Sequence, residues 1–150
     1  MLDSKFKNVK ILLQDVKVMQ LATSIDDQPW IVNLYFVVDN KARFYWLSEK
    51  TTRHSKDIEN NSKISISAVI KQSPPVIGLQ VAGEAKEIGD IKTIAKVMPG
   101  YIAKYGKGKD FLQLFKKGSA RHRLYELTPN AIQLFDELNY KPSDNPLQLL

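Results

Sequence analysis

The sequence predicts a mainly β protein, an antiparallel barrel of six or seven strands with short helices between them. Segments rich in β-branched and aromatic residues recur along the 150 residues and are separated by turn-forming segments. Two of the turns join consecutive strands, which indicates an antiparallel meander. An open sheet of this size must protect its edges, and closure into a barrel is the usual solution.

The chain is expected to form one domain over residues 1–150. A helix over residues 1–16 precedes a barrel over residues 17–136, and an irregular tail covers residues 137–150. Asp3 or Ser4 can cap the first helix. Its apolar residues recur at helical spacing and are Phe6, Val9, Leu12, Leu13 and Val16.

Three strands are expected next, over Val18–Ile25, Trp30–Val38 and Ala42–Ser48. Asp26-Asp27-Gln28-Pro29 and Asp39-Asn40-Lys41 have the composition of turns between them. This arrangement is typical of two consecutive hairpins.

The middle of the chain predicts a helix over Thr51–Asn61, begun by a threonine cap and ended by asparagine. Lys63–Ile70 alternates between apolar and polar residues, as a half-buried strand does. Ser73-Pro74-Pro75 breaks the chain before a long strand over Val76–Ile88. Gly83 marks a bulge or bend in that strand.

The last third begins with a helix capped by Asp90, which Pro99-Gly100 should interrupt. Lys107-Gly108-Lys109 is expected to be a mobile basic loop, either a plain connection or a lid. Asp110 then caps a short helix over Phe111–Lys117.

Two final strands, Arg121–Leu127 and Ala131–Phe135, are predicted on either side of a Thr128-Pro129-Asn130 turn. The first strand begins with the cationic run Arg121-His122-Arg123. This run could meet an anionic substrate or a cofactor held by a partner subunit. Exposed charges that protect a sheet edge are an equally good interpretation.

Composition excludes several classes of site. The chain has no cysteine, so disulfides, thiolate metal sites and a cysteine nucleophile are absent, in keeping with a reducing cytoplasm. No metal site is expected, since His54 and His122 are the only histidines. We expect neither a signal peptide nor a membrane helix, because no apolar run approaches about 20 residues. The net charge of +6 favours anionic partners.

The most informative segment runs from Phe44 to His54. It places Ser48, Thr51 and Thr52 at the end of a strand and the start of a helix, next to the pair Arg53-His54. The first turn of a helix carries unpaired N–H groups and a partial positive charge that suit a phosphate. A guanidinium adds a planar fork of donors. A simple threonine cap with exposed basic neighbours explains the same spacing equally well.

The chain resembles a known family at this point. Its ordered segments are Phe44-Tyr45-Trp46-Leu47-Ser48, then Thr51-Thr52-Arg53-His54, then Ile58-Glu59-Asn60-Asn61. They resemble the FMN-binding split barrels of the pyridoxamine 5'-phosphate oxidase type, and a small uncharacterised branch most closely. The likeness implies a six- to seven-stranded antiparallel split barrel and an FMN phosphate held by Thr52, Arg53 and His54. His54 stands where a lysine is usual.

The same resemblance implies further flavin contacts. Asn33, Leu34 and Tyr35 would lie along the flavin ring, although Asn33 replaces a residue that is often basic. Leu47 and Ser48 would lie against the flavin edge and phosphate, and Gln80 would donate to the ring edge. Strand packing is the alternative for Leu34, and solvent exposure is the alternative for Gln80.

The family likeness leads us to expect a homodimer with FMN at the interface and oxidoreductase activity on an unknown small molecule. No catalytic acid or base stands out. A second hypothesis is a non-catalytic binder of flavin, a deazaflavin or haem, or a protein without a cofactor. Nucleic-acid binding, suggested by the net charge and by Tyr35, Tyr45 and Trp46, ranks last because no recognition motif accompanies them.

Overall fold

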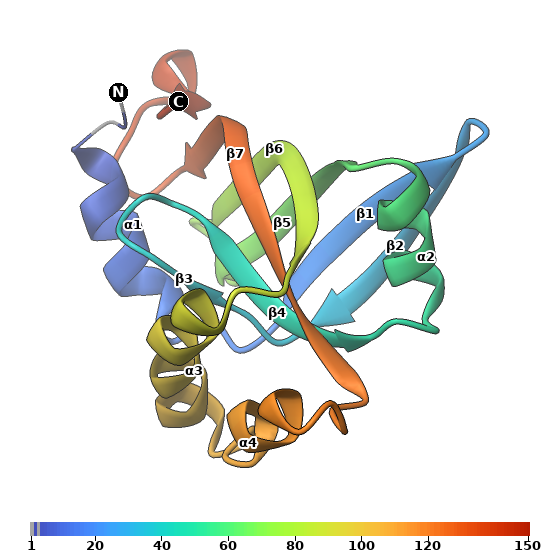
Figure 1. The fold of residues 1–150 in the computed structure, drawn as a ribbon. Helices are drawn as coiled ribbons and strands as arrows, with labels where there is room; N and C mark the ends of the chain where they lie inside the picture. Colours follow the sequence, from blue (N-terminus) through green and yellow to red (C-terminus); the bar gives the residue numbers. More distant parts are fainter. Residues whose placement is uncertain (1, 3) are drawn as a thin grey trace.

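The computed structural model describes residue 2 and residues 4–150 of the chain. Figure 1 shows a strongly twisted sheet with helices around it. The helices and strands, in chain order, are α1 (Lys5–Leu13), β1 (Met19–Ile25), β2 (Gln28–Leu34), β3 (Val37–Val38), β4 (Phe44–Glu49), α2 (Arg53–Asn60), β5 (Lys63–Lys71), β6 (Ile77–Ile88), α3 (Ile91–Tyr105), α4 (Phe111–Lys116), β7 (His122–Asp136), η1 (Pro142–Asp144) and β8 (Leu147–Gln148).

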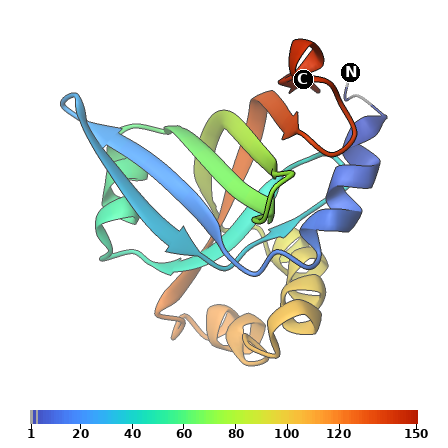
Figure 2. The same ribbon diagram turned by 180° about the vertical axis from the view of Figure 1, so that it is seen from behind.

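The strands form one antiparallel sheet of eight strands in the order β2-β1-β5-β6-β7-β4-β3, with β8 paired to β7. The two ends of this path, β2 and β3, are consecutive in the chain and separated only by Tyr35 and Phe36. The sheet therefore coils until its ends are neighbours, as Figures 1 and 2 show from opposite sides. The mainly β, antiparallel prediction is confirmed, with one strand more than expected.

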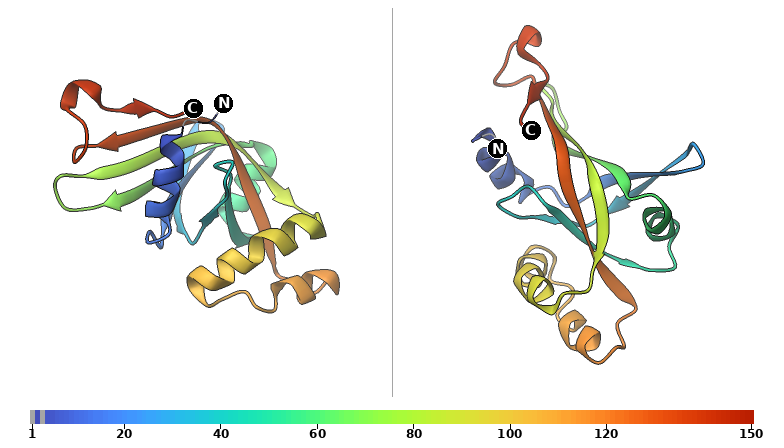
Figure 3. Two further views of the ribbon diagram at one scale, coloured as in Figure 1. Left: turned by 90° about the vertical axis from the view of Figure 1, so that its left-hand side faces the viewer. Right: turned by 45° about the horizontal axis from the view of Figure 1, so that its top comes forward.

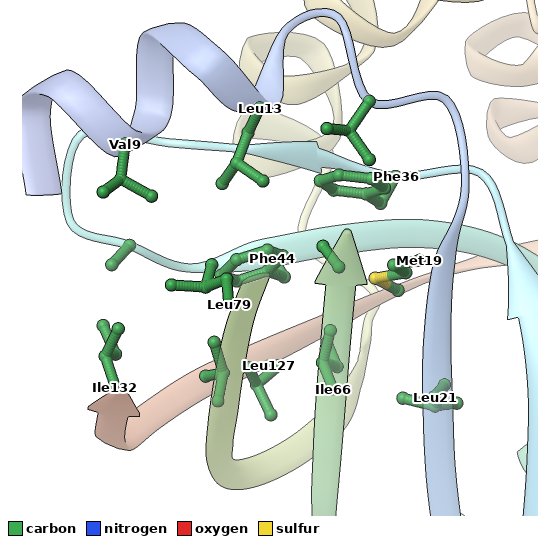
Figure 4. Close-up of a cluster of buried hydrophobic side chains, with 14 of the residues drawn as sticks. Val9, Leu13, Met19, Leu21, Phe36, Phe44, Ile66, Leu79, Leu127 and Ile132 are labelled. Atoms are coloured by element: carbon green, nitrogen blue, oxygen red, sulfur yellow. The ribbon is translucent and has the colours of Figure 1, made fainter. Parts of the chain in front are cut away.

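The inner face of the coiled sheet holds the main core. Fully buried side chains from α1 and from every long strand except β2 meet there, among them Leu13, Met19, Phe44, Leu79 and Leu127 (Figure 4), and Val32 and Leu34 of β2 pack against them partly buried. A second cluster joins buried side chains of α3 and α4 to β4, β6 and β7. Figure 3 shows the two helices side by side below the sheet. The two clusters share β4, which turns Phe44 and Trp46 to the first and Tyr45 to the second. Burial removes Tyr45 and Trp46 from any surface where bases could stack.

The first helix is shorter than predicted and ends at Leu13. Asp3 lies outside the described residues, and Ser4 stands at the N-cap position without a side-chain capping bond. Val16 is buried beyond the helix end, whereas Leu12 is exposed.

The strand predicted over Trp30–Val38 is divided, because distant side chains bind the backbone in its middle. Phe36 N–H donates to Tyr105 Oη at 2.9 Å, and Lys104 Nζ donates to the Phe36 carbonyl at 3.1 Å. These bonds satisfy the backbone groups that a sheet partner would otherwise take. β2 consequently ends at Leu34, and β3 pairs with β4 instead.

The predicted interruption at Pro99 is wrong, because α3 runs through this residue to Tyr105. Proline removes one backbone donor. The helix nevertheless buries Ile94, Met98 and Tyr101 in the second cluster. We attribute its continuity to this apolar contact. Gly106 ends the helix in the left-handed region at φ +66°.

The predicted Thr128-Pro129-Asn130 turn is also wrong, because β7 is continuous through these residues. The register with β6 shifts there, between Ala82 and Gly83, so the irregularity is a bulge. A Cβ atom on Gly83 would lie 2.1 Å from the Thr128 carbonyl oxygen, which explains why glycine stands opposite the bulge. The bulge or bend predicted at Gly83 is confirmed as an irregularity at this position, but the extra residue, Asn130, lies on the facing strand β7.

The tail expected to be irregular is partly ordered against the barrel. β8 pairs with β7, and Leu149 N–H donates to the Ile132 carbonyl at 2.8 Å. Leu149 is buried in the main core. No helix among the described residues is long and apolar enough to cross a membrane.

Candidate functional site

The turn from β4 into α2, which we call the α2 corner (residues 47–55), places several polar side chains together. Thr52 caps the helix: Ser55 N–H donates to its Oγ1 at 3.4 Å. Thr52 Oγ1 also donates to the Glu49 carbonyl at 2.9 Å. Both interactions hold the first turn of α2 against the end of the strand, as the threonine cap in the sequence predicts.

His54 is buried at this corner, with 6% of its surface exposed. Its Nε2 atom lies 2.7 Å from Ser48 Oγ and 3.3 Å from Thr52 Oγ1. Burial lowers the pKa of His54 below its usual value, and the nearby Asp57 carboxylate offsets this only in part. The imidazole is therefore neutral at neutral pH and orders the two hydroxyl groups, where the lysine usual in the resembled family would bring a charge.

The base of α2 is fixed to the barrel by a second buried contact. Thr23 Oγ1, on β1, donates to Asp57 Oδ2 at 2.7 Å. Both side chains are buried. This bond between a strand and the middle of the helix fixes the direction in which the start of α2 points.

Arg53 and Lys50 are the exposed cations of the corner, and Lys50 Nζ lies 3.8 Å from Glu87. The guanidinium carbon of Arg53 lies 4.0 Å from the centroid of the Trp30 ring on β2. Stacking on an aromatic face leaves the edge of a guanidinium free to donate. Arg53 forms no hydrogen bond or ion pair with the residues that the structure describes. Thr51 is also exposed beside it.

The α2 corner therefore has the chemistry of an anion site. It combines a helix N-terminus, an unpaired guanidinium fork and hydroxyl groups, and it contains no carboxylate on its exposed side other than Glu49, which binds Arg121 at 3.3 Å. The residues present fit a phosphate group. They fit it with one unpaired positive side chain, Arg53, because Lys50 lies 3.8 Å from Glu87 and His54 is neutral and turned toward Ser48.

Two other predicted site residues line a different cavity, of about 440 Å³, which we call the basic cavity. Leu47 and Tyr35 lie in its wall, together with residues of the loop 107–109 and of 121–122. The Tyr35 ring stacks on that of Tyr105 at 4.7 Å between centroids, and Lys107 Nζ lies 5.1 Å from the Tyr35 centroid. Leu34, the residue before Tyr35 in the chain, is partly buried against the main core.

Asn33 and Gln80 lie on the outer face of the sheet, in a polar row that crosses six strands. The aligned residues of the row are Asn33, Gln20, Ser67, Gln80, Gln133 and Gln148. Gln20 Nε2 donates to Asn33 Oδ1 at 3.1 Å, and Ser67 Oγ donates to Gln20 Oε1 at 3.2 Å. Most of the row lines a shallow hollow of about 340 Å³.

The structure thus distributes the predicted residues over three surface places, and it packs Leu34 against the main core. Ser48, Thr52, Arg53 and His54 meet at the α2 corner with Thr51. Residues at the other two places come from distant segments. The sequence did not predict that Arg53 stacks on Trp30 or that Thr23 bonds to Asp57. The members of each pair lie more than 20 positions apart, and no motif joins them.

Comparison with known proteins gives a consistent result. A family model described as pyridoxamine 5'-phosphate oxidase matches residues 6–136. No curated protein sequence matches the chain significantly.

Solved structures share the fold at low sequence identity. The conserved hypothetical protein Rv2991 of Mycobacterium tuberculosis has a TM-score of 0.73 at 10% identity, over 88% of this chain and 84% of that one. HutZ, a haem storage protein of Vibrio cholerae, has a TM-score of 0.67 at 19% identity, over 87% and 92%. A haem-binding protein of Mycobacterium smegmatis has a TM-score of 0.73 at 13% identity, over 91% of this chain but only 56% of its own length.

Proposed function

The chain belongs to the pyridoxamine 5'-phosphate oxidase family, and from this premise we propose that it is an FMN-binding oxidoreductase that acts on a small molecule. The observation that carries the proposal is the α2 corner. Arg53 stands there unpaired beside a capped helix start, next to Ser48, Thr52 and His54, which are bonded to one another. Such an arrangement suits a phosphate ester, because hydrogen bonds from a guanidinium to phosphate oxygens are charge-assisted.

Each residue of the corner has a distinct task in this proposal. Arg53 donates to the phosphate, and the first N–H groups of α2 add to the same field. Thr52 caps the N-terminus of α2. Neutral His54 holds the Ser48 hydroxyl in place. Bound FMN supplies hydride acceptance and its onward transfer. We assign no residue as a catalytic acid or base.

The flavin ring is proposed to lie along the end of β2, near Asn33, Leu34 and Tyr35, with Leu47 at its edge. Gln80 lies on the outer face of the sheet in the same polar row as Asn33, but on β6, three strands away from it. A second copy of the chain, packed on that face, could bring its own Gln80 to the ring. We therefore propose a homodimer, and the hollow and small side chains of this face support it. Sedimentation at micromolar concentration should show a dimer, and a monomer alone would contradict this.

The proposed cofactor is tested by absorption spectra of the purified protein during titration with FMN, a deazaflavin and haemin. A saturable change with FMN, at one flavin per chain, is the expected result. If the folded protein takes up no flavin, the oxidoreductase proposal is wrong even though the fold stands.

Haem binding is the second candidate. Two of the similar structures are described as haem proteins, and His122 is exposed in the wall of the basic cavity. His54 is buried and bonded to Ser48, so His122 is the histidine that could ligate iron. A haemin absorption band that is lost in His122→Ala and kept in His54→Gln would favour this function.

A further inference from the structure

The basic cavity combines a cationic rim with an apolar interior. Lys107, Lys109, Arg121 and His122 line it, as do the apolar side chains of Leu47, Phe111, Leu114 and Ala120. The cavity lies between β4, the connection from α3 to α4 and the start of β7, at the end of the barrel where Figure 3 shows α4 beside β7. Its volume of about 440 Å³ suits a small organic molecule.

The positive charge of the rim is poorly compensated. Among the residues that the structure describes, Asp110 is the one carboxylate in the wall. Glu49 lies 3.3 Å from Arg121, but the Arg121 side chain is 82% exposed. An exposed pair of this kind contributes little and leaves the cation available to a ligand. Lys107, Lys109 and Arg121 are positively charged at neutral pH, and together around one opening they attract an anionic group.

The loop that carries Lys107 and Lys109 has a backbone conformation that only glycine adopts easily, and it packs closely on α3. Gly106 and Gly108 both have positive φ, +66° and +90°. A Cβ atom on Gly108 would lie 2.9 Å from Met98 Cε and 3.5 Å from Tyr101 Cδ1. Phe111 N–H donates to the Gly108 carbonyl at 3.1 Å. The loop is therefore packed closely on α3 at Gly108. Because its backbone is already in place, little conformational entropy is lost when Lys107 and Lys109 bind a ligand.

The cavity adjoins the α2 corner through β4. Leu47 lines the cavity, and the next residue, Ser48, bonds to His54. The strand pairing places Glu49 opposite His122, one of the rim residues. A molecule in the cavity would thus lie beside the site proposed for the flavin.

We propose that the basic cavity binds a small aromatic anion, with its carboxylate or phosphate at Lys107, Lys109 and Arg121 and its ring on the apolar interior. That this molecule is the substrate rests on the proposed function. The binding of the anion does not, because the rim and interior belong to this chain alone.

Titration calorimetry on the full chain with phenyl phosphate, benzoate and benzyl alcohol tests the proposal. We expect at least one of the two anions to bind at least tenfold more tightly than the neutral alcohol. Binding by benzoate alone would assign a carboxylate, and binding by phenyl phosphate alone would assign a phosphate ester. Equal affinity for all three, or no binding, would overturn the proposal.

Charge-matched variants locate the binding. Lys107→Gln with Lys109→Gln should weaken anion binding at least fivefold. Lys116→Gln with Lys117→Gln removes two exposed lysines just beyond the cavity and should change it less than twofold. An equal loss in both pairs would show that only net charge matters. Circular dichroism of each variant checks that it is folded.

Two further arms separate this inference from the proposed function. Arg53→Ala should leave the affinity for benzoate, which lacks the phosphate that the α2 corner is proposed to bind, within twofold, and a large loss would place the anion at the α2 corner and overturn the proposal. FMN is titrated in parallel. Flavin uptake without anion binding contradicts this inference alone, whereas anion binding without flavin uptake supports it and removes the flavin function.

Discussion

The α2 corner and the basic cavity are neighbours on β4, yet they are organised in opposite ways. The polar groups of the corner lie within eight residues, from Ser48 to Ser55. Ser48, His54 and Ser55 are buried, and each of them lies within hydrogen-bonding distance of another polar side chain of the corner. The charges of the cavity come from two distant segments, are exposed, and have few partners. The buried part of the corner is therefore ordered by its own hydrogen bonds, and Arg53 is the cation of the corner that has no ion-pair partner. The cavity is ordered by the backbone of its loop, and its charged side chains are available to bind a ligand.

The sharpest difference should appear in Arg53→Ala. We expect FMN affinity to fall by about 2–3 kcal/mol, or roughly 30- to 150-fold in Kd, because a charge-assisted contact to phosphate is lost. The free energy of unfolding should change by about 1 kcal/mol or less, since the guanidinium contributes only its exposed stacking on Trp30. Flavin fluorescence titration and urea unfolding measure the two effects.

Lys56→Ala is the matched control, because Lys56 is an exposed cation on the same helix. It should leave the Kd for FMN within about twofold, as expected for a charge outside the site. An equal loss in both variants would mean that the corner attracts FMN only through net charge.

Ser48→Ala tests whether the corner is ordered by its own bonds. Removing this hydroxyl leaves His54 Nε2 without its closer partner in a buried place. The free energy of unfolding should fall by about 1–3 kcal/mol, the cost of an unsatisfied buried polar group. Urea denaturation measures it. Ser119→Ala, at an exposed serine, should change stability by about 0.5 kcal/mol or less, and an equal result for the two serines would argue against a structural role of the Ser48 bond.

Gly108→Ala tests whether the cavity is ordered by its backbone. A side chain at φ +90°, close to Met98, should cost about 1–2 kcal/mol of stability. It should also weaken aromatic anion binding, because both neighbouring lysines move with the loop. Thermal unfolding and calorimetry measure the two quantities. An unchanged affinity would show that the lysines act without a fixed loop.

The smallest effect expected is on pH dependence. Burial lowers the pKa of His54 in the folded state, so the unfolded chain binds the proton more readily. The stability contributed by neutral His54 is fully present above the unfolded pKa of about 6.5 and declines as the pH falls below it. Urea unfolding at several pH values should show this loss, and His54→Gln should reduce it. His122→Gln, at the exposed histidine, should not.

The comparison also explains how much of the structure could be predicted. Alternation over Lys63–Ile70 predicts β5, and Thr52 predicts the start of α2, because both signals lie within one short segment. For the same reason, the grouping of Ser48, Thr52 and His54 could be expected from spacing alone.

The errors fall where distant residues decide the local structure. The break in Trp30–Val38 depends on Tyr105 and Lys104, about 70 positions away. The bulge in β7 depends on the missing Cβ of Gly83 on the neighbouring strand. The basic cavity could not be predicted either, since its cations come together only after folding.

The central claim is that the α2 corner binds the phosphate of FMN. The most direct measurement compares FMN with riboflavin, which carries the same ring without the phosphate, in parallel titrations of the wild-type chain and of Arg53→Ala. The wild type should bind FMN about 30-fold or more tightly than riboflavin, in line with a phosphate contact of about 2 kcal/mol, and Arg53→Ala should remove most of this preference. Equal affinity of the wild-type chain for the two flavins would contradict the claim.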